Sequence, residues 1–298
     1  MHGWLILDKP VGLGSTQAVS AVKRALREAG HGKAKVGHGG TLDPLAQGVL
    51  PVAVGEATKL AGRMLDSDKV YSFTVRFGAQ TDTLDLEGAI IATSAARPTR
   101  TQVVGALPGF TGPIEQAPPA YSAILIDGVR AYDRARAGET VEMKLRAVTV
   151  HALTIVDTEG TEGRLDAVTL RAHVSKGTYI RSLARDLALA LGTVGHVTML
   201  RREKAGPFTL DSAISLDNLR DAAKARAIAQ HMLPLTAGLD DIPALPVTPE
   251  QAKALKQGRT LAGAPRIQGL MLAMEGETPI ALVEALGPDI KVVRGFNL

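Results

Sequence analysis

Asp43 is the residue whose surroundings in the sequence most suggest chemistry, because residues 35–50 place it among four glycines and one histidine, His38. Glycine loses more conformational entropy on ordering than other residues, so this stretch indicates a backbone folded tightly around one carboxylate. Glycoside hydrolysis requires two carboxylates flanking the bond, and the stretch offers one. Phosphate binding by a glycine-rich loop requires Gly-Lys-Ser/Thr after the glycines, which is absent here. The chemistry left open is that of a single acid.

The dipeptide Asp43–Pro44 also has a purely structural interpretation. An aspartate N-cap followed by proline at the first helical position is typical of a helix start. Gly48 would then end that turn. On this dipeptide alone, the helix cap is the favoured interpretation.

The composition predicts a globular protein with a sizeable core. The chain has 298 residues, 45% of them hydrophobic, enough for one large domain and a smaller one. It lacks the roughly 18 consecutive apolar residues of a membrane span. No basic leader or cleavage site is visible at the start, so we expect these residues to enter the fold directly. The absence of cysteine excludes disulfides and thiolate chemistry, and the seven histidines are dispersed along the chain. We therefore expect no metal site.

The basic residues are concentrated in two segments. Residues 1–65 hold eight lysines and arginines against four acids, and residues 171–206 hold seven against two. If the two segments meet in space, they would form a track for a polyanion such as nucleic acid. Ordinary solvated helix faces explain the same counts equally well.

Hydrophobic periodicity predicts an α+β protein with a mixed, largely antiparallel sheet and flanking helices. A boundary is expected near residues 238–243, followed by a small β-rich unit with a helix at 252–257 and strands at 270–273, 280–284 and 290–294. In the larger part, strands are predicted at 4–7, 49–54, 69–77, 146–157, 164–175 and 196–200, and helices at 15–28, 57–65, from about 99 to 107, 130–137, 178–191 and 211–231.

Two further residues have unusual positions within these predicted elements. Arg181 falls in the first turn of its helix, where a cation opposes the helix macrodipole. Some other interaction must therefore hold it, unless it points into water. Tyr71 alternates with Phe73, Val75 and Phe77 on one face of its strand. That pattern is equally typical of a core residue.

Five segments closely resemble, in order, the motifs of the TruB family of tRNA pseudouridine synthases: 3–12, 37–48, 65–71, 81–83 and 175–183. The resemblance extends over roughly residues 3–208. It implies the pseudouridine synthase fold for residues 1–238, including an RNA-binding insert. For residues 239–298 it implies a small β-rich, PUA-like RNA-binding domain.

The activity implied by the resemblance is conversion of uridine 55 in the T-arm of tRNA to pseudouridine, with no cofactor and no metal. The N1–C1′ bond breaks, the base turns, and C5 bonds to C1′. Asp43 is implied as the nucleophile, attacking either C1′ or C6. A nearby cation favours the ionised carboxylate, and Arg181 is the natural partner. Tyr71 would stack on the uracil, and its hydroxyl would take the C5 proton.

The remaining site residues are also implied by the family pattern. His38 would occupy the gap left by the flipped nucleotide, and Lys9 would support the loops of the pocket. Tyr179 and Leu200 would line the uracil pocket, although both positions also suit core residues. Two departures from the pattern are small: Arg130 stands slightly offset from the usual basic position before Tyr132, and Gly14 replaces a common Ser or Thr.

The partner implied is the T-arm stem-loop of tRNA, bound by a cytoplasmic monomer without a guide RNA or a membrane. One alternative is a guide-dependent relative, but such relatives carry longer basic extensions than this sequence shows. Another is a non-catalytic RNA-binding protein that unpairs and releases the T-arm. The presence of Asp43 argues against loss of catalysis, and it leaves an added tRNA-folding chaperone role open.

Overall fold

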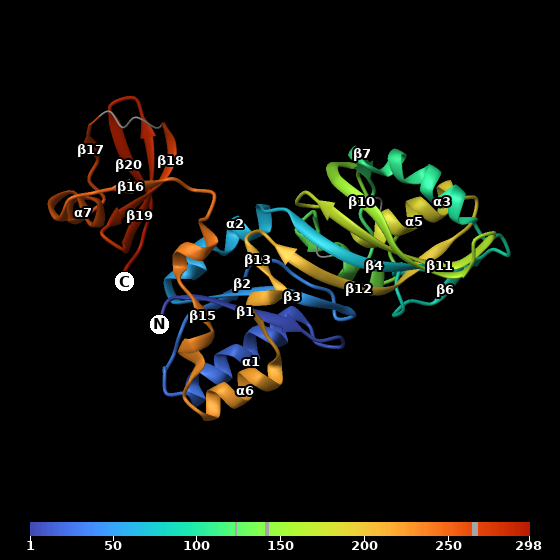
Figure 1. The fold of residues 1–298 in the computed structure, drawn as a ribbon, viewed down its shortest axis with the longest axis horizontal. Helices are drawn as coiled ribbons and strands as arrows, with labels where there is room; N and C mark the ends of the chain where they lie inside the picture. The colour runs from blue at the N-terminus through green and yellow to red at the C-terminus, as the bar shows by residue number, and fades with distance from the viewer. Residues whose placement is uncertain (123, 141–142, 264–267) are drawn as a thin grey trace.

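The computed structural model describes residues 1–298 except 123, 141–142 and 264–267. Within the described residues, the chain forms a large eleven-stranded sheet and a separate five-stranded sheet (Figure 1). Helices cover both faces of the large sheet, and the α+β class expected from the sequence is confirmed. No helix in the described part of the chain is long and apolar enough to cross a membrane.

The large sheet is built around one central strand that joins its two halves. β12 (Gly195–Ala205) pairs in parallel with β3 (Ala46–Val54) and antiparallel with β4 (Lys69–Phe77). β3 continues to β1 (Gly3–Lys9), and β4 continues to the long hairpin of β11 (Arg164–Val174) and β10 (Arg146–Thr161), with β7 (Gly112–Gln116) at the edge. Segments far apart in sequence therefore meet at β12.

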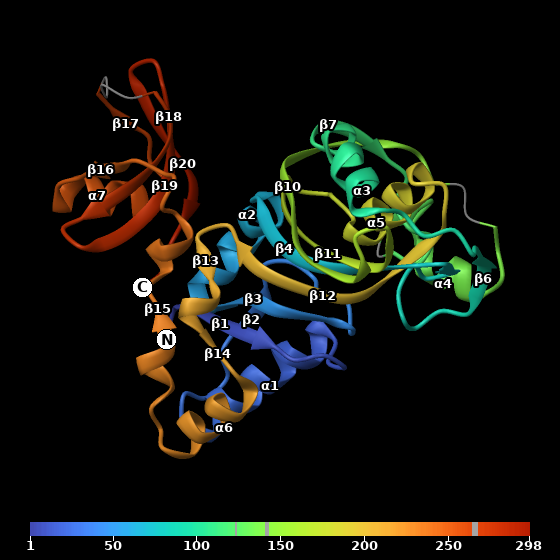
Figure 2. The ribbon, with the colours of Figure 1, turned by 45° about the vertical axis from the view of Figure 1, so that its right-hand side comes forward.

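The helices lie where their apolar stripes can be buried. α1 (Ser15–Glu28) and α6 (Leu216–Lys224) lie side by side below β1 and β3 in both ribbon views (Figures 1 and 2). Val19, Val22 and Leu26 recur at helical spacing and join one core with the strands. On the other half of the sheet, α5 (Ile180–Ala190) covers β4 and β11 with a second buried cluster.

The smaller sheet follows the order β16-β18-β19-β20-β17. Its central strands are β18 (Gly269–Glu275), β19 (Thr278–Leu286) and β20 (Asp289–Gly295), and α7 (Pro249–Lys256) packs on them. Leu272, Leu282 and Phe296 join a third cluster with Trp4 of β1. The two sheets therefore share one apolar cluster.

Short elements complete the chain. They are β2 (Val36–His38), η1 (Gly55–Leu60), α2 (Ala61–Asp66), β5 (Ala79–Thr81), β6 (Ile90–Thr93), α3 (Arg100–Ala106), η2 (Leu107–Phe110), β8 (Leu125–Ile126), β9 (Val129–Arg130), α4 (Ala131–Arg136), β13 (Phe208–Thr209), η3 (Leu210–Ser212), β14 (Ala213–Ile214), η4 (Ile228–His231), β15 (Met232–Leu233), η5 (Leu235–Gly238), β16 (Ala244–Pro246) and β17 (Leu261–Ala262).

The structure corrects the helix-cap interpretation of Asp43. Residues 43–46 form a turn closed by the Ala46 N–H donating to the Asp43 carbonyl at 3.0 Å, and β3 follows at once. Gly48 lies inside β3 with φ of +104°. A Cβ there would lie 2.2 Å from the Arg202 carbonyl oxygen, so this position requires glycine to let β12 approach. The glycine serves strand pairing and does not end a helix.

Other differences concern boundaries. Helix 57–65 is a 3₁₀ turn followed by α2, and of the predicted helix 211–231 only α6 is α-helical. Arg201 to Lys204 continue β12, because Arg201 and Arg202 pair with both β3 and β4 and Lys204 pairs with β4. The sequence offers Ser15 or Thr16 as the N-cap of the first helix, but the N-cap of α1 is Gly14.

Two smaller expectations also follow from the sequence. Val104 was expected with Val103 and Leu107 among the apolar residues of its helix, but it is exposed on α3. The prolines at 113, 118 and 119 predict a rigid extended segment over 112–123; β7 forms its first part, and residue 123 lies outside the described residues.

Candidate active site

Asp43 and Arg181 form an ion pair, as the sequence predicts. Asp43 stands at the turn before β3, and Arg181 is the second residue of α5. The guanidinium Nη2 lies 2.9 Å from the Asp43 carboxylate oxygen Oδ2. The Arg181 side chain is 8% exposed and that of Asp43 41% exposed. The cation is buried, while the carboxylate still faces open space.

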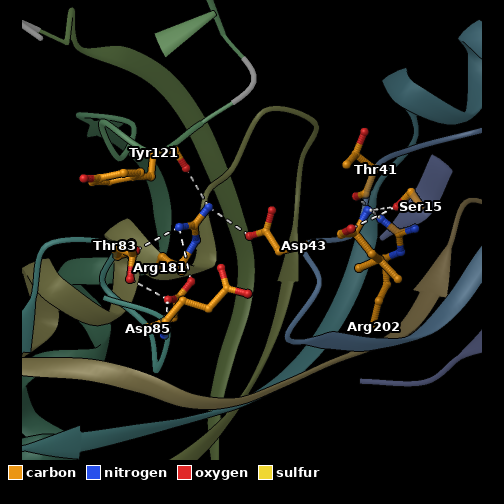
Figure 3. Close-up of polar contacts among 10 residues, drawn as sticks. Ser15, Thr41, Asp43, Thr83, Asp85, Tyr121, Arg181 and Arg202 are labelled. Atoms are coloured by element: carbon orange, nitrogen blue, oxygen red, sulfur yellow. Dashed lines mark hydrogen bonds and ion pairs between the residues drawn. The ribbon is translucent and has the colours of Figure 1, made fainter. Parts of the chain in front are cut away.

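Additional partners hold the Arg181 guanidinium against the helix macrodipole. Its Nη1 lies 3.3 Å from the Asp85 carboxylate and donates to the Thr83 carbonyl at 2.8 Å. Its Nη2 also donates to the Tyr121 carbonyl at 3.0 Å. Figure 3 shows the guanidinium between the two carboxylates. These contacts supply the interaction that a cation at a helix start requires.

Asp85 is a functional candidate that the sequence analysis missed. Its carboxylate is buried and accepts from the Thr83 hydroxyl at 2.6 Å and the Glu87 N–H at 3.0 Å. A buried carboxylate is stable only when it is paired and hydrogen-bonded, and Arg181 completes that set. The polar turn 81–88 was the available signal, but three acids stand in it, and spacing alone does not select Asp85.

Arg202 fixes the loop before Asp43 and was also missed. Its side chain is 1% exposed, and its guanidinium donates to the carbonyls of Val49 at 2.8 Å, Gly40 at 3.1 Å and Thr41 at 3.2 Å. The fork of an arginine side chain reaches several carbonyls at once. For the segment that contains Arg201-Arg202-Glu203-Lys204, charge alone left a polyanion track and a solvated surface equally open. The alternation of β12 sends Arg202 into the protein instead.

The loop is held from α1 as well. The Ser15 hydroxyl donates to the Leu42 carbonyl at 2.9 Å and accepts from the Leu42 N–H at 2.8 Å. Ser15 is buried. In Figure 3, Ser15, Thr41 and Arg202 lie together on the opposite side of Asp43 from Arg181. The N–H and the carbonyl of Leu42, the residue before Asp43, are therefore both hydrogen-bonded to Ser15.

Lys9 lies beneath the same loop and is fully buried. Its ammonium donates to the carbonyls of Leu13 at 2.6 Å, Pro10 at 2.9 Å and Pro44 at 3.3 Å. This geometry fits the predicted support of the pocket's loops. The pKa of Lys9 is lowered to about 8, mainly by burial; Asp43 partly offsets this effect, and the positive Arg202 adds to it.

The predicted residues line two adjoining spaces that share Asp43. A cavity of about 300 Å³ is lined by Asp43, Arg181, Tyr71, Tyr179 and Leu200. A wider cleft of about 860 Å³ shares Asp43 and Arg181 and is lined by His38, Arg130 and Tyr132. The fold therefore brings all predicted site residues except Lys9 to these two spaces. Lys9 stays behind the loop.

Burial favours the neutral forms of two ionisable side chains near the ion pair, Tyr179 and His38. Burial raises the pKa of the Tyr179 hydroxyl, so this group stays protonated and can donate a hydrogen bond. Burial, with a smaller effect of Arg202, lowers the pKa of His38. The His38 imidazole Nδ1 accepts from the Gly40 N–H at 3.4 Å. One paired carboxylate at a cavity of ligand size can act as a nucleophile.

Comparisons with known proteins identify relatives over the whole chain. Residues 23–180 match the family described as TruB family pseudouridylate synthase (N terminal domain), and residues 181–240 match the tRNA pseudouridylate synthase B C-terminal domain. The tRNA pseudouridine synthase B of Novosphingobium aromaticivorans is 63% identical over 100% of this chain and 98% of its own. That of Zymomonas mobilis is 61% identical, covering 100% and 96%.

Solved structures show the same fold. A structure described as a Cbf5-Nop10-Gar1 complex matches with a TM-score of 0.74 and 26% identity, over 99% of this chain and 85% of the other. An H/ACA RNP bound to a substrate RNA containing 2'-deoxyuridine matches with the same TM-score and coverage at 24% identity. At 24% identity, the likeness to the H/ACA RNP structure shows a shared fold alone.

We predict that Arg202→Lys loosens the loop before Asp43. A lysine ammonium lacks the fork that reaches three carbonyls, so protein stability should fall by about 2 kcal/mol. Urea unfolding measures this loss, and hydrogen exchange should speed up at the amides of Leu42 and Ala46. The control is Arg201→Lys, whose side chain pairs with Asp8 at the protein surface. Equal effects of the two substitutions would contradict the assignment.

We further predict a pH-dependent contribution of Lys9. Its pKa is about 8 in the folded protein but about 10.4 in the unfolded chain. Between these values the unfolded chain holds a proton that the folded protein has lost, so stability rises with pH there. The free energy of unfolding of wild type relative to Lys9→Met should increase by up to about 1.4 kcal/mol per pH unit.

Chemical unfolding across that pH range measures the trend. Lys23→Met, at an exposed position of α1, is the control and should show none. A difference between wild type and Lys9→Met that is flat or falls as pH rises would show that Lys9 is not held at a desolvating site.

Proposed function

This chain belongs to the TruB family of pseudouridylate synthases, and from that premise we propose that it isomerises uridine 55 in the T-arm of tRNA with Asp43 as the nucleophile. Its relatives named tRNA pseudouridine synthase B support uridine isomerisation in tRNA as the activity. The observation that carries the proposal is the 2.9 Å ion pair of Asp43 and Arg181 at the mouth of the cavity.

The proposed chemistry uses one carboxylate. Asp43 attacks C1′ of the ribose or C6 of the uracil, and the N1–C1′ bond breaks. The base turns, and C5 forms a bond to C1′. The bond from Asp43 to C1′ or C6 breaks again and releases the carboxylate, the C5 proton leaves, and N1 gains a proton. The Arg181 guanidinium favours the ionised carboxylate that attack requires. Tyr71 lines the cavity beside Asp43 and is the proposed stacking ring and acceptor of the C5 proton.

Base flipping accounts for the two adjoining spaces. A base must leave its stack to reach a nucleophile on the wall of a protein cavity, and the smaller cavity is of the size that takes a small ligand. Tyr179 and Leu200 on its wall are proposed to contact the uracil. His38 lines the wider cleft and is proposed to fill the gap that the flipped nucleotide leaves. Lys9 supports the turn at Pro44.

The wider proposal concerns the whole RNA substrate. Residues 1–238 form the catalytic domain with an RNA-binding insert, and residues 239–298 form a PUA-like domain that contacts RNA. The enzyme works as a cytoplasmic monomer on tRNA and needs no guide RNA, no cofactor and no metal for the reaction. Its relatives at 61–63% identity are named for tRNA alone, which supports a guide-independent substrate. Opening of the T-arm would also allow a role in tRNA folding.

We predict that wild-type enzyme forms pseudouridine at position 55 and that Asp43→Asn forms none. The amide is isosteric but is not a nucleophile, so T-arm binding should stay within a few-fold of wild type. Pseudouridine mapping of tRNA treated with each protein locates the product. Tritium release from C5-labelled uridine measures the rate.

Two results would overturn parts of this proposal separately. Full tritium release by Asp43→Asn would show that Asp43 is not the nucleophile. Modification by wild type at another uridine would leave the chemistry intact but reject position 55. A refolding assay on Asp43→Asn protein tests the chaperone role without the isomerisation.

We also predict that Arg181→Lys lowers turnover by roughly 100-fold or more while tRNA affinity changes little. Removing one electrostatic contact to a reacting group typically has this cost, and lysine keeps a charge beside the buried Asp85. Single-turnover kinetics and filter binding separate the two quantities. Arg185→Ala, one turn further along α5, is the control. Equal losses of turnover and affinity would make Arg181 a phosphate contact instead.

A further inference from the structure

Two histidines and an aspartate meet on the large sheet, outside both active-site spaces. Asp68 directly precedes β4, His151 belongs to β10, and His173 belongs to β11. The apolar residues of β11 that alternate with His173 pack with α5, so the cluster lies on the opposite face of the sheet. The dispersed histidines had predicted no metal site. Spacing along the chain does not reveal contacts across neighbouring strands.

The ligand atoms of the three side chains converge. His151 Nε2 lies 3.1 Å and His173 Nε2 lies 3.7 Å from the same Asp68 oxygen, Oδ2. The imidazole ring centroids are 4.7 Å apart, and the three ligand atoms lie within 4.8 Å of one another. Tetrahedral zinc with bonds of about 2.0–2.1 Å separates its ligand atoms by roughly 3.3 Å. The observed distances lie on either side of that value.

We propose that Asp68, His151 and His173 form a surface site for a divalent zinc-class ion, with water completing the coordination. Imidazole nitrogen and carboxylate oxygen are common zinc ligands, and sites with three protein ligands keep a position for water. Asp68 and His151 are exposed, so the ion has a path from solvent.

The hairpin of β10 and β11 has an irregularity at His151. Val150 pairs with Val174, but the next pair is Ala152 with His173, so β10 has one extra residue at this point. His151 and Ala152 are both exposed between the buried Val150 and Leu153. A β-bulge changes the direction of a side chain in this way, and bulges are frequent at functional positions.

The third ligand is held rigidly. The Asp68 carbonyl accepts from the Gly206 N–H at 3.0 Å. The next residue, Lys69, is buried and donates to the carbonyls of Met64 and Leu65 at the end of α2. Preformed ligands on rigid elements lose little freedom when they bind an ion.

One positive neighbour of the cluster is already paired. Arg171, two residues before His173 on β11, pairs with Glu203 at 2.7 Å. Both Nε2 atoms face the same Asp68 carboxylate oxygen, so a single ion between them can contact all three groups.

The proposed ion would join three strands. It would tie the start of β4 to the bulge of β10 and to β11. Lys69 and Tyr71 follow Asp68 on β4 and line the cavity. The ion therefore has a structural role next to the active site and takes no part in the reaction.

The test uses full-length, tag-free protein freed of metal with a chelator. Calorimetric titration with Zn²⁺ should show one saturable site, and the Co²⁺ form should show the visible spectrum of an ordered site. Loss of an outer contact to a metal ligand already costs 10–100-fold in affinity. His151→Ala, His173→Ala and Asp68→Asn should each weaken binding at least tenfold. Zn²⁺ should raise the melting temperature of wild type but not that of these variants.

His231→Ala is the matched control, because His231 is exposed and lies outside the cluster. It should bind Zn²⁺ as wild type does. Isomerase activity should persist in all four variants, which shows that they fold. Absence of saturable binding by wild type would mean that the cluster is a histidine–aspartate ion pair only. Undiminished binding by any of the three ligand variants would also overturn the proposal.

Discussion

The contact of one guanidinium with two carboxylates is the constraint on which the site depends. Arg181 faces Asp43 at 2.9 Å and Asp85 at 3.3 Å. Removing one partner from a buried ionic group is costly, because the remaining charge loses its compensation. The two acids nevertheless differ. Asp85 is 8% exposed and hydrogen-bonded by its own turn, while Asp43 is 41% exposed. Asp85 therefore secures the cation, and Asp43 keeps an oxygen toward the cavity.

The position of Asp43 is set by tertiary contacts and not by its own secondary structure. Its loop is fixed by Arg202 from β12, Ser15 from α1 and Lys9 from β1. These contacts all reach backbone carbonyls or amides, so they fix the chain and leave the carboxylate itself unobstructed. A buried polar group must be hydrogen-bonded, and here the loop backbone supplies partners for the buried cations. The loop and the three elements that hold it, β1, β12 and α1, therefore stabilise each other.

The sequence predicted the strands around β12 and the helix that carries Arg181, because both have strong hydrophobic periodicity. The partnership of Arg181 with Asp43 was also predicted, from a cation placed against a helix dipole. The helix start favoured on Asp43–Pro44 alone does not form, because β3 pairs with β12 from Ala46 onward and with β1 from Gly48 onward, and this pairing outweighs a local cap. Asp85 was missed because its role requires a contact with a residue almost a hundred positions away.

Counting charges along the sequence also could not show which charged side chains become buried in contacts with distant residues. The two basic segments do meet where β3 and β12 pair, as a polyanion track requires. Yet Lys9, Arg181 and Arg202, which contributed to those counts, are buried against carbonyls and carboxylates. They strengthen the loop and the ion pair instead of attracting RNA from solution. The charge available to a polyanion near α1 belongs to exposed residues such as Lys23, Arg24 and Arg27. The net charge of a segment therefore counts buried cations, which stabilise the fold, together with exposed cations, which can bind a polyanion.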